Sequence, residues 1–191
     1  MRSYSKNRDR NENRAHIPRP ALTLIVRTRP GHPSQGLLIA GNRVMRCARG
    51  RSGIAALKRE GDGATPLAPM VVLGGYYRNG RAGLQTRLSM TRIRADLGWC
   101  DRPGDRNYNR PVRLPYGGSH EGMFRKDHLY DVVLVLGWNI RPRRRNLGSA
   151  IFLHLARAGY APTEGCVAVS ARDMAWLAPR LGPGSVVRVK G

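Results

Sequence analysis

The sequence predicts a mainly β fold with one or a few short helices, and its turn residues and apolar pattern both favour this class. Twenty-three glycines and thirteen prolines among 191 residues provide many turn positions and leave few stretches suited to long helices. Short aliphatic and β-branched runs recur between those turns, whereas helical spacing of apolar residues occurs in one segment. Hydrophobic residues make up 41% of the chain, which is enough for the core of one domain plus some tail.

The predicted strands follow one another from residue 22 onward and end at turns. The first covers residues 22–27 and precedes a turn at residues 30–33. The segments 36–40 and 43–47 form a hairpin around a Gly-Asn pair that is typical of tight turns. Because the segment 130–136 contains an aliphatic run without alternation, VVLVL after Asp131, it should be buried on both faces. Further strands are expected over residues 70–73, 90–93, 112–114, 148–154, 167–169 and 185–189.

One helix is predicted near the C-terminus. Ser170 is a good N-cap residue, and Asp173 follows three positions later in a variant of the capping box. The helix should extend to about Arg180, because the Gly-Pro-Gly sequence at 182–184 ends it. Apolar residues share one face of this helix at Met174, Leu177 and Leu181.

The chain divides into a tail and a domain. Residues 1–20 are charged and polar without an apolar period, so they are predicted to be a disordered basic tail, and residues 21–191 form the domain. No signal peptide is visible, since the first apolar run, 21–26, is too short for one. No stretch approaches the ~20 apolar residues that a membrane span needs.

The net charge of +22 is extreme for this length and suggests a polyanionic environment. The environment could be nucleic acid, anionic lipid or an acidic wall polymer, or the arginines could serve no dedicated patch. The densest basic run, 141–145 (RPRRR), either borders an active site or is a solvated loop. A non-enzymatic nucleic-acid-binding protein is therefore one alternative. No dedicated nucleic-acid site is expected, because no recognisable binding motif occurs in the sequence.

The cysteine and histidine spacing argues against a metal site. Cys47, Cys100 and Cys166 lie far apart, which excludes zinc-ribbon and thioredoxin motifs and leaves at least one free thiol. His120-Glu121 begins like a metalloprotease helix motif, but phenylalanine occupies position 124 where the second histidine belongs. No metal and no cofactor are expected.

The segment from His154 to Cys166 has the parts of a thiol nucleophile. Cysteine attacks carbonyls as the thiolate, so it needs a neighbouring base, and His154 follows a hydrophobic run that should hold it in place. Gly165 leaves the backbone bare beside the sulfur, and the amides of Gly165 and Cys166 could face an oxyanion. These residues predict a cysteine acyl-transfer site in which His154, Gly165 and Cys166 are catalytic.

An ordered series of short motifs resembles the L,D-transpeptidase catalytic domain family, whose members remodel bacterial peptidoglycan. The resemblance covers roughly residues 21–191, and the ordered series is more specific than the cysteine motif alone. The matching segments are 58–66 (KREGDGATP), 98–101 (GWCD), 108–110 (YNR), 130–131 (YD), 137–139 (GWN), 148–154 (GSAIFLH) and 163–166 (TEGC).

The resemblance implies a β-sandwich and acyl transfer through a thioester, with peptidoglycan stem peptides as partners. It implies substrate contacts from Thr163 and Glu164 and from Tyr108, Asn109 and Arg110. An L,D-carboxypeptidase or endopeptidase, in which water replaces the acceptor amine, is the alternative within the family. The resemblance also implies a location in the cell envelope or periplasm. It leaves the oligomeric state open.

A third group should orient the imidazole of His154. The sequence offers the side chains of Glu164, Asp131 and Asn139 for this role, or a backbone carbonyl. The family commonly uses a carbonyl, so the resemblance assigns no side chain to it.

Overall fold

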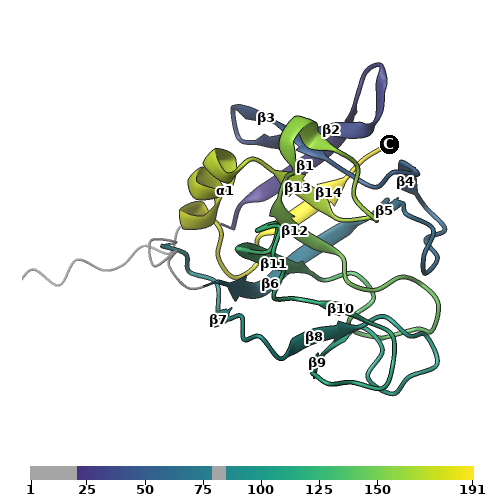
Figure 1. Ribbon diagram of the computed structural model, residues 1–191. Helices are drawn as coiled ribbons and strands as arrows, with labels where there is room; N and C mark the ends of the chain where they lie inside the picture. Colours follow the sequence, from purple (N-terminus) through teal and green to yellow (C-terminus); the bar gives the residue numbers. More distant parts are fainter. Residues whose placement is uncertain (1–20, 79–84) are drawn as a thin grey trace, which may run out of the picture.

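A nine-stranded mixed sheet forms the centre of the protein in a computed structural model that describes residues 21–78 and 85–191 (Figure 1). The predicted tail, residues 1–20, lies outside the described residues. In spatial order the strands are β11 (Val132–Leu136), β12 (Phe152–Leu155), β13 (Val167–Val169), β3 (Arg43–Ala48), β2 (His32–Ala40), β1 (Thr23–Arg29), β14 (Val186–Val189), β6 (Pro69–Tyr77) and β7 (Met90–Arg92).

The sheet curves back on itself through β6. One edge of β6 pairs with β14 and then β7, and its other edge pairs with β11, so the first and eighth strands of the order meet. The halves of the sheet therefore enclose a common apolar core, to which all eight strands of the closed part contribute buried residues. Methionine and aliphatic side chains such as Met70 and Leu134 fill this core.

Two small sheets flank the large one. β8 (Leu97–Cys100) pairs with β9 (Arg110–Arg113) and β10 (His120–Gly122), and this three-stranded sheet lies beside β6 and β11 at the bottom of Figure 1. The short strands β4 (Ile54–Ala55) and β5 (Thr65–Pro66) pair in parallel and enclose the loop between them.

The helix near the C-terminus is capped as predicted but ends earlier. Ser170 Oγ accepts a hydrogen bond from the Asp173 amide at 3.0 Å, which begins α1 (Ala171–Leu177). The chain then tightens into a 3-10 turn, η2 (Ala178–Arg180), where a proline cannot donate the backbone hydrogen bond that would continue the α-helix. A second 3-10 turn, η1 (Ala158–Tyr160), lies between β12 and β13.

The mainly β prediction is confirmed, and the differences from it have local causes. The strand expected over 148–154 begins only at Phe152, because Gly148 and Ala150 adopt positive φ angles of 88° and 52°. Strands β4, β5, β8 and β10 were not predicted, since each has only two to four residues and shows no clear alternation.

Strand β11 is buried along its whole length, as its sequence predicts. Val132, Leu134 and Leu136 face the main core, whereas Val133 and Val135 face a second apolar cluster that includes Trp99 and Phe152. The second cluster lies between β11–β12 and the three-stranded sheet. Cys166 belongs to it, which places the sulfur on the side of the large sheet that β8 and β10 cover.

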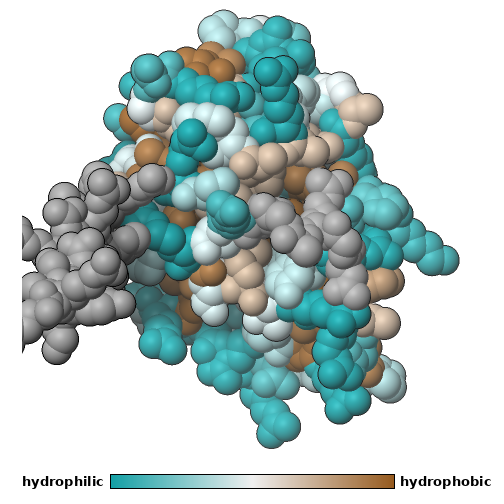
Figure 2. Space-filling view, turned by 90° about the vertical axis from the view of Figure 1, so that its left-hand side faces the viewer, coloured by the Kyte–Doolittle hydropathy of each residue, from teal (hydrophilic) through white to brown (hydrophobic). Residues whose placement is uncertain are grey.

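The outer surface carries most of the charge. Figure 2 shows one face covered mainly by hydrophilic side chains, with hydrophobic residues exposed only in small separate areas. Among residues 21–78 and 85–191, no helix has both the length and the apolar character to cross a bilayer.

Candidate active site

A cavity of about 480 Å³ opens beside β12 and β13 and contains both predicted catalytic side chains. Its walls come from the end of β8, from β10, from β12 and from the loops around residues 60 and 160. The lining residues are Glu60, Gly61, Asp101, Glu121, Arg125, Leu129, Tyr130, Ser149, Ala150, His154, Arg157, Ala161, Pro162, Thr163, Glu164, Cys166 and Ala168.

Cys166 lies directly before β13, and its thiol is held by two backbone groups. Sγ donates to the carbonyl of Ala150 at 3.2 Å and accepts from the amide of Phe152 at 3.3 Å. The residue is 7% exposed, and that exposure faces the cavity. The sulfur is therefore positioned and protonated in this structure, with its hydrogen directed at a carbonyl.

His154 is fixed by its own strand end. Its Nδ1 lies 2.8 Å from the carbonyl of Leu155, and because a carbonyl can only accept, Nδ1 carries the proton and Nε2 has the free lone pair. The ring packs at a steep angle against that of Tyr130, with centroids 5.1 Å apart. A backbone carbonyl thus orients this imidazole, whereas Glu164 and Asp131 form other ion pairs and Asn139 bonds to backbone.

The two side chains are diagonal neighbours on one face of the sheet. β12 and β13 run parallel, with Leu153 opposite Val167 and His154 opposite Ala168. Cys166 and Ala168 are two residues apart, so their side chains lie on the same face of the sheet. Cys166 is therefore two residues before the residue that lies opposite His154. Such neighbours are separated by about 7 Å between backbones, which a long side chain spans.

Burial keeps both groups uncharged. It raises the pKa of the Cys166 thiol to about 12, and the nearby Glu121 carboxylate adds to this effect. Burial also lowers the pKa of His154 to about 4, despite the favourable bond to Leu155. At neutral pH the pair is a thiol beside a neutral imidazole, which is a base able to take a proton.

Gly165 is required by packing as well as by its backbone angle. Its φ of 132° lies in the region that favours glycine, and an added Cβ would lie 2.8 Å from the carbonyl oxygen of Ala64. Its amide donates to Thr163 Oγ1 at 3.2 Å. The predicted role of this amide at an oxyanion stays a prediction, and in this structure Thr163 takes its hydrogen bond.

Thr163 and Glu164 line the cavity, and both are held by the loop after β3. Thr163 Oγ1 donates to the Cys166 carbonyl at 2.6 Å, and the Thr163 backbone exchanges hydrogen bonds with Arg49 and Arg51. Glu164 is exposed and forms an ion pair with Arg51 at 2.9 Å. These contacts fix the turn that carries Gly165 and Cys166.

Tyr108, Asn109 and Arg110 are not among the residues that line the cavity. Arg110 is exposed at the start of β9, and the hydroxyl of Tyr108 donates to Glu60, which lines the cavity. The predicted contact of these three residues with substrate stays a prediction. In the structure, Tyr108 and Asn109 form hydrogen bonds with residues of the cavity wall.

Asn109 is buried, and four hydrogen bonds satisfy its side chain. Oδ1 accepts from Trp99 Nε1 at 3.0 Å and from the amide of Ala150 at 3.1 Å. Nδ2 donates to the carbonyls of Trp138 and Asn139 at 3.1 and 2.9 Å. One amide group therefore ties β8 and the segment after β11 to Ala150, whose carbonyl accepts from the thiol of Cys166.

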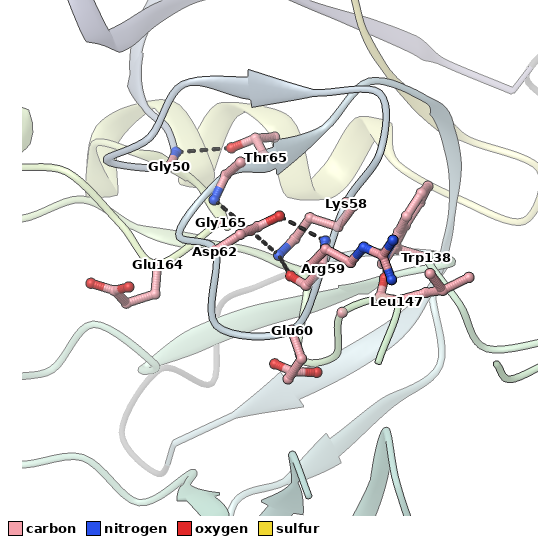
Figure 3. Close-up of polar contacts among 12 residues, drawn as sticks. Gly50, Lys58, Arg59, Glu60, Asp62, Thr65, Trp138, Leu147, Glu164 and Gly165 are labelled. Atoms are coloured by element: carbon pink, nitrogen blue, oxygen red, sulfur yellow. Dashed lines mark hydrogen bonds and ion pairs between the residues drawn. The ribbon is translucent and has the colours of Figure 1, made fainter. Parts of the chain in front are cut away.

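The loop between β4 and β5 is built around a buried lysine (Figure 3). Lys58 Nζ donates to Asp62 Oδ1 at 2.5 Å and to the carbonyl of Arg59 at 2.7 Å, and its side chain is 3% exposed. Burial opposes ionisation of Asp62, but hydrogen bonds from Arg59, Lys58 and Ala64 together lower its pKa. This loop supplies the Ala64 carbonyl against which Gly165 packs, and Glu60 in the cavity wall.

Several cavity residues, among them Glu121, Arg125 and Tyr130, were not assigned to the site from the sequence. Glu121 Oε1 accepts from the Tyr130 hydroxyl at 2.6 Å and from Arg125 at 3.2 Å. Burial raises the pKa of Glu121, and it also holds the pKa of Tyr130 well above its usual value. The four-residue spacing of Glu121 and Arg125 was a weak signal, because this spacing normally indicates a helix and the residues lie on and after a strand.

The remaining candidates lie elsewhere or form no site. Cys47 and Cys100 are buried free thiols, and the basic run 141–145 does not line the cavity. Within the described part of the chain, histidine, cysteine and carboxylate side chains nowhere gather in a group of three suited to a metal ion.

Comparison with known proteins identifies the family of the chain. The sequence pattern of the YkuD family, the L,D-transpeptidase catalytic domain, matches residues 34–189. No curated protein matches the chain. The chain is also similar to two solved structures. Each match has 13% sequence identity and covers 90% of the present chain. L,D-transpeptidase 1 of Mycobacterium tuberculosis has a TM-score of 0.41 and 62% coverage of that chain. An L,D-transpeptidase from Mycobacterium smegmatis has a TM-score of 0.42 and 59% coverage.

The chain spans about three-fifths of the length of these two structures. The family pattern, in contrast, extends from β2 to the last residue of β14 and so includes both His154 and Cys166. The chain therefore belongs to the L,D-transpeptidase catalytic domain family.

Proposed function

We propose that this protein is a cysteine-dependent acyltransferase that acts on peptidoglycan stem peptides, an L,D-transpeptidase. One observation carries the proposal: Cys166 and His154 are diagonal neighbours on adjacent parallel strands and open into the same cavity. Membership of the family supports the same activity. Because peptidoglycan lies in the cell wall, the proposal places the protein in the cell envelope or periplasm.

The first step forms a thioester. The thiol of Cys166 turns from the Ala150 carbonyl toward His154, and Nε2 takes its proton. The thiolate adds to a peptide carbonyl, the carbon–nitrogen bond breaks, and the imidazolium returns the proton to the leaving amine. Hydrogen bonding of Nδ1 to Leu155 keeps the ring oriented and stabilises the imidazolium while it exists.

The second step resolves the thioester. An amine of another stem peptide attacks the thioester carbonyl, an amide forms, and the sulfur regains its proton through His154. Attack by water in place of the amine gives hydrolysis, which is the carboxypeptidase or endopeptidase outcome. The amides of Gly165 and Cys166 are the proposed oxyanion donors, for which Thr163 Oγ1 would release the Gly165 amide. Thr163 and Glu164 are the proposed substrate contacts on this wall.

The test combines turnover with labelling of the thiol. The protein is incubated with a tetrapeptide stem, with and without an amine acceptor, and separately with a carbapenem, and both reactions are read by mass spectrometry. We expect a cross-linked product with the acceptor and a single adduct on Cys166. Both should disappear in Cys166→Ala, and turnover should fall by at least about a hundredfold in His154→Gln.

Cys100→Ala is the matched control, because this buried thiol lies outside the cavity lining and should leave the adduct intact. Absence of both product and adduct at high reagent excess would overturn the proposal, as would an adduct that persists in Cys166→Ala. Formation of the shortened donor peptide with a free carboxylate, and of no cross-linked product even when the acceptor is present, would assign the enzyme to the hydrolytic branch.

A further inference from the structure

The cavity has a charge balance opposite to that of the whole chain. The chain has 34 lysines and arginines against 12 aspartates and glutamates. Among residues 21–78 and 85–191, four carboxylates line the cavity, but only two lysines or arginines do. The carboxylates are Glu60, Asp101, Glu121 and Glu164, and the basic residues are Arg125 and Arg157.

Most of these charges already have partners within the protein. Glu164 is paired with Arg51, Glu60 accepts from a tyrosine hydroxyl, and Glu121 accepts from Arg125 and Tyr130. The two arginines also pair with an aspartate outside the lining, Asp127.

Asp101 is different, because its Oδ1 is fully buried and has no hydrogen-bond partner among the described residues. A buried carboxylate oxygen without a partner is rare in native proteins, since burial removes its water.

A second buried oxygen in the cavity wall also lacks a partner in the described structure. Ser149 is 7% exposed, and its Oγ makes no hydrogen bond to any described residue. Ser149 is a neighbour of the Tyr108 hydroxyl and acts to lower the pKa of that group, against the larger effect of burial. Two oxygens in one cavity wall are therefore buried without a hydrogen-bond partner in the described structure.

The backbone places the two oxygens on the same side of the cavity. The amide of Asn109 donates to the carbonyl of Cys100 at 2.8 Å, and Oδ1 of Asn109 accepts from the amide of Ala150 at 3.1 Å. Asp101 directly follows Cys100 in the chain, and Ser149 directly precedes Ala150. Asn109 therefore holds together the two segments that carry the unpaired oxygens.

Glu121 adds a second carboxylate to this wall. Glu121 on β10 lies opposite Trp99 on β8. Asp101 is two residues after Trp99, so its side chain lies on the same face of the small sheet. This face packs on Phe152, whose ring centroid lies 5.1 Å from that of Trp99, next to the thiol of Cys166. The wall is thus acidic, rich in acceptors and adjacent to the nucleophile.

We propose that Asp101 and Ser149, with Glu121 beside them, form a subsite for a primary ammonium group carried by the peptide substrate. An ammonium group has three N–H donors and a positive charge, so it matches two unpaired oxygens next to a second carboxylate. The subsite rests on the proposed function for its placement beside the reacting carbonyl. The ammonium can belong to the side chain of a diamino acid in the donor stem or to the amino group of the acceptor.

Binding to the inactive Cys166→Ala protein tests this without turnover. The first stem peptide has a blocked N-terminus and a free side-chain amine on its diamino acid. The second is identical except that the side-chain amine is acetylated. The third has an acetylated side-chain amine and a free N-terminal amine. Calorimetry at low salt should show that one free-amine peptide binds about tenfold or more tightly than the second peptide. The peptide that does so identifies the source of the ammonium.

Variants then assign the preference to the two oxygens. Asp101→Asn should bring the affinity ratio to within about twofold of one, because the amide of asparagine lacks the charge. Ser149→Ala should reduce the ratio in part, which gives a second reading if one variant folds poorly. Asp96→Asn removes the same charge from a carboxylate paired with Arg94 and Arg113 outside the cavity, and should leave the ratio unchanged.

A ratio near one in the Cys166→Ala protein, including failure of every peptide to bind, would overturn the subsite. So would a ratio that survives Asp101→Asn. The proposed function is judged separately, by turnover of the unmodified protein. Loss of turnover with a ratio that Asp101→Asn abolishes would reject the transpeptidase and keep the ammonium subsite.

Discussion

Asn109 and Cys166 are connected through a single residue, Ala150. Asn109 Oδ1 accepts from the Ala150 amide, and the Ala150 carbonyl accepts from the Cys166 thiol, at 3.1 and 3.2 Å. Ala150 adopts a φ of 52°, which an L residue holds only when its surroundings require it. The asparagine therefore fixes the conformation that presents a carbonyl to the sulfur.

Replacing the buried Asn109 with alanine removes four hydrogen bonds, one buried and three partly buried, and leaves the bonded groups without this partner. We expect the free energy of unfolding to fall by about 2–4 kcal/mol, measured by urea denaturation. Alkylation of Cys166 by iodoacetamide should also become faster, because the thiol loses its fixed acceptor. Asn42→Ala, at an exposed turn position, should change stability by no more than about 0.5 kcal/mol. Equal effects of the two variants would contradict the supportive role of Asn109.

The need for glycine at position 165 can be tested by Gly165→Ala, with the same substitution at another glycine as the control. Gly165→Ala places a methyl group 2.8 Å from the Ala64 carbonyl at a φ of 132°, so the turn must shift. We expect a loss of about 2 kcal/mol or more in unfolding free energy and loss of carbapenem labelling. Gly104→Ala has open space around its new methyl group and should stay within about 0.5 kcal/mol. A Gly165→Ala protein with unchanged stability and labelling would show that the loop around Ala64 yields easily.

The sequence predicted the elements of the fold better than their arrangement. The hairpin of β2 and β3 and the doubly buried β11 were predictable because hydrophobic pattern and turn residues act over a few positions. The pairing of β6 with β11, which closes the sheet, joins residues about 60 positions apart, and no local pattern encodes it.

The candidate site shows the same division. His154 and Cys166 were identified from residue type and order, and the structure places them in one cavity. Glu121, Tyr130 and Asp101 converge on that cavity from segments that local sequence reasoning could not bring together. The expected contact of Asn109 with substrate stays a prediction, and the four hydrogen bonds of its side chain within the protein were not foreseen.

The Lys58–Asp62 ion pair should hold the loop that supports Gly165. A double-mutant cycle with Lys58→Met, Asp62→Asn and the double variant measures their coupling in unfolding free energy. We expect a coupling of about 1–3 kcal/mol, because the ammonium is buried and the two groups are 2.5 Å apart. The exposed pair Arg51–Glu164 serves as the comparison cycle and should give less than about 1 kcal/mol. Coupling near zero for Lys58–Asp62 would remove this pair from the support of the site.

His154 should make the protein less stable in weak acid, since burial lowers its pKa from 6.5 to about 4. Between these values the unfolded chain binds a proton that the folded protein does not, so the unfolding free energy falls as pH decreases through this range. The full contribution of His154 to the unfolding free energy is about 3 kcal/mol and is present above pH 6.5.

The measurement is the difference in unfolding free energy between the parent protein and His154→Gln. A difference is needed because Glu121, whose pKa is raised, changes the unfolding free energy with the opposite sign in an overlapping pH range. That difference should vary with pH only between about 4 and 6.5. A flat curve for His154→Gln would mean that the imidazole takes up a proton freely in the folded state.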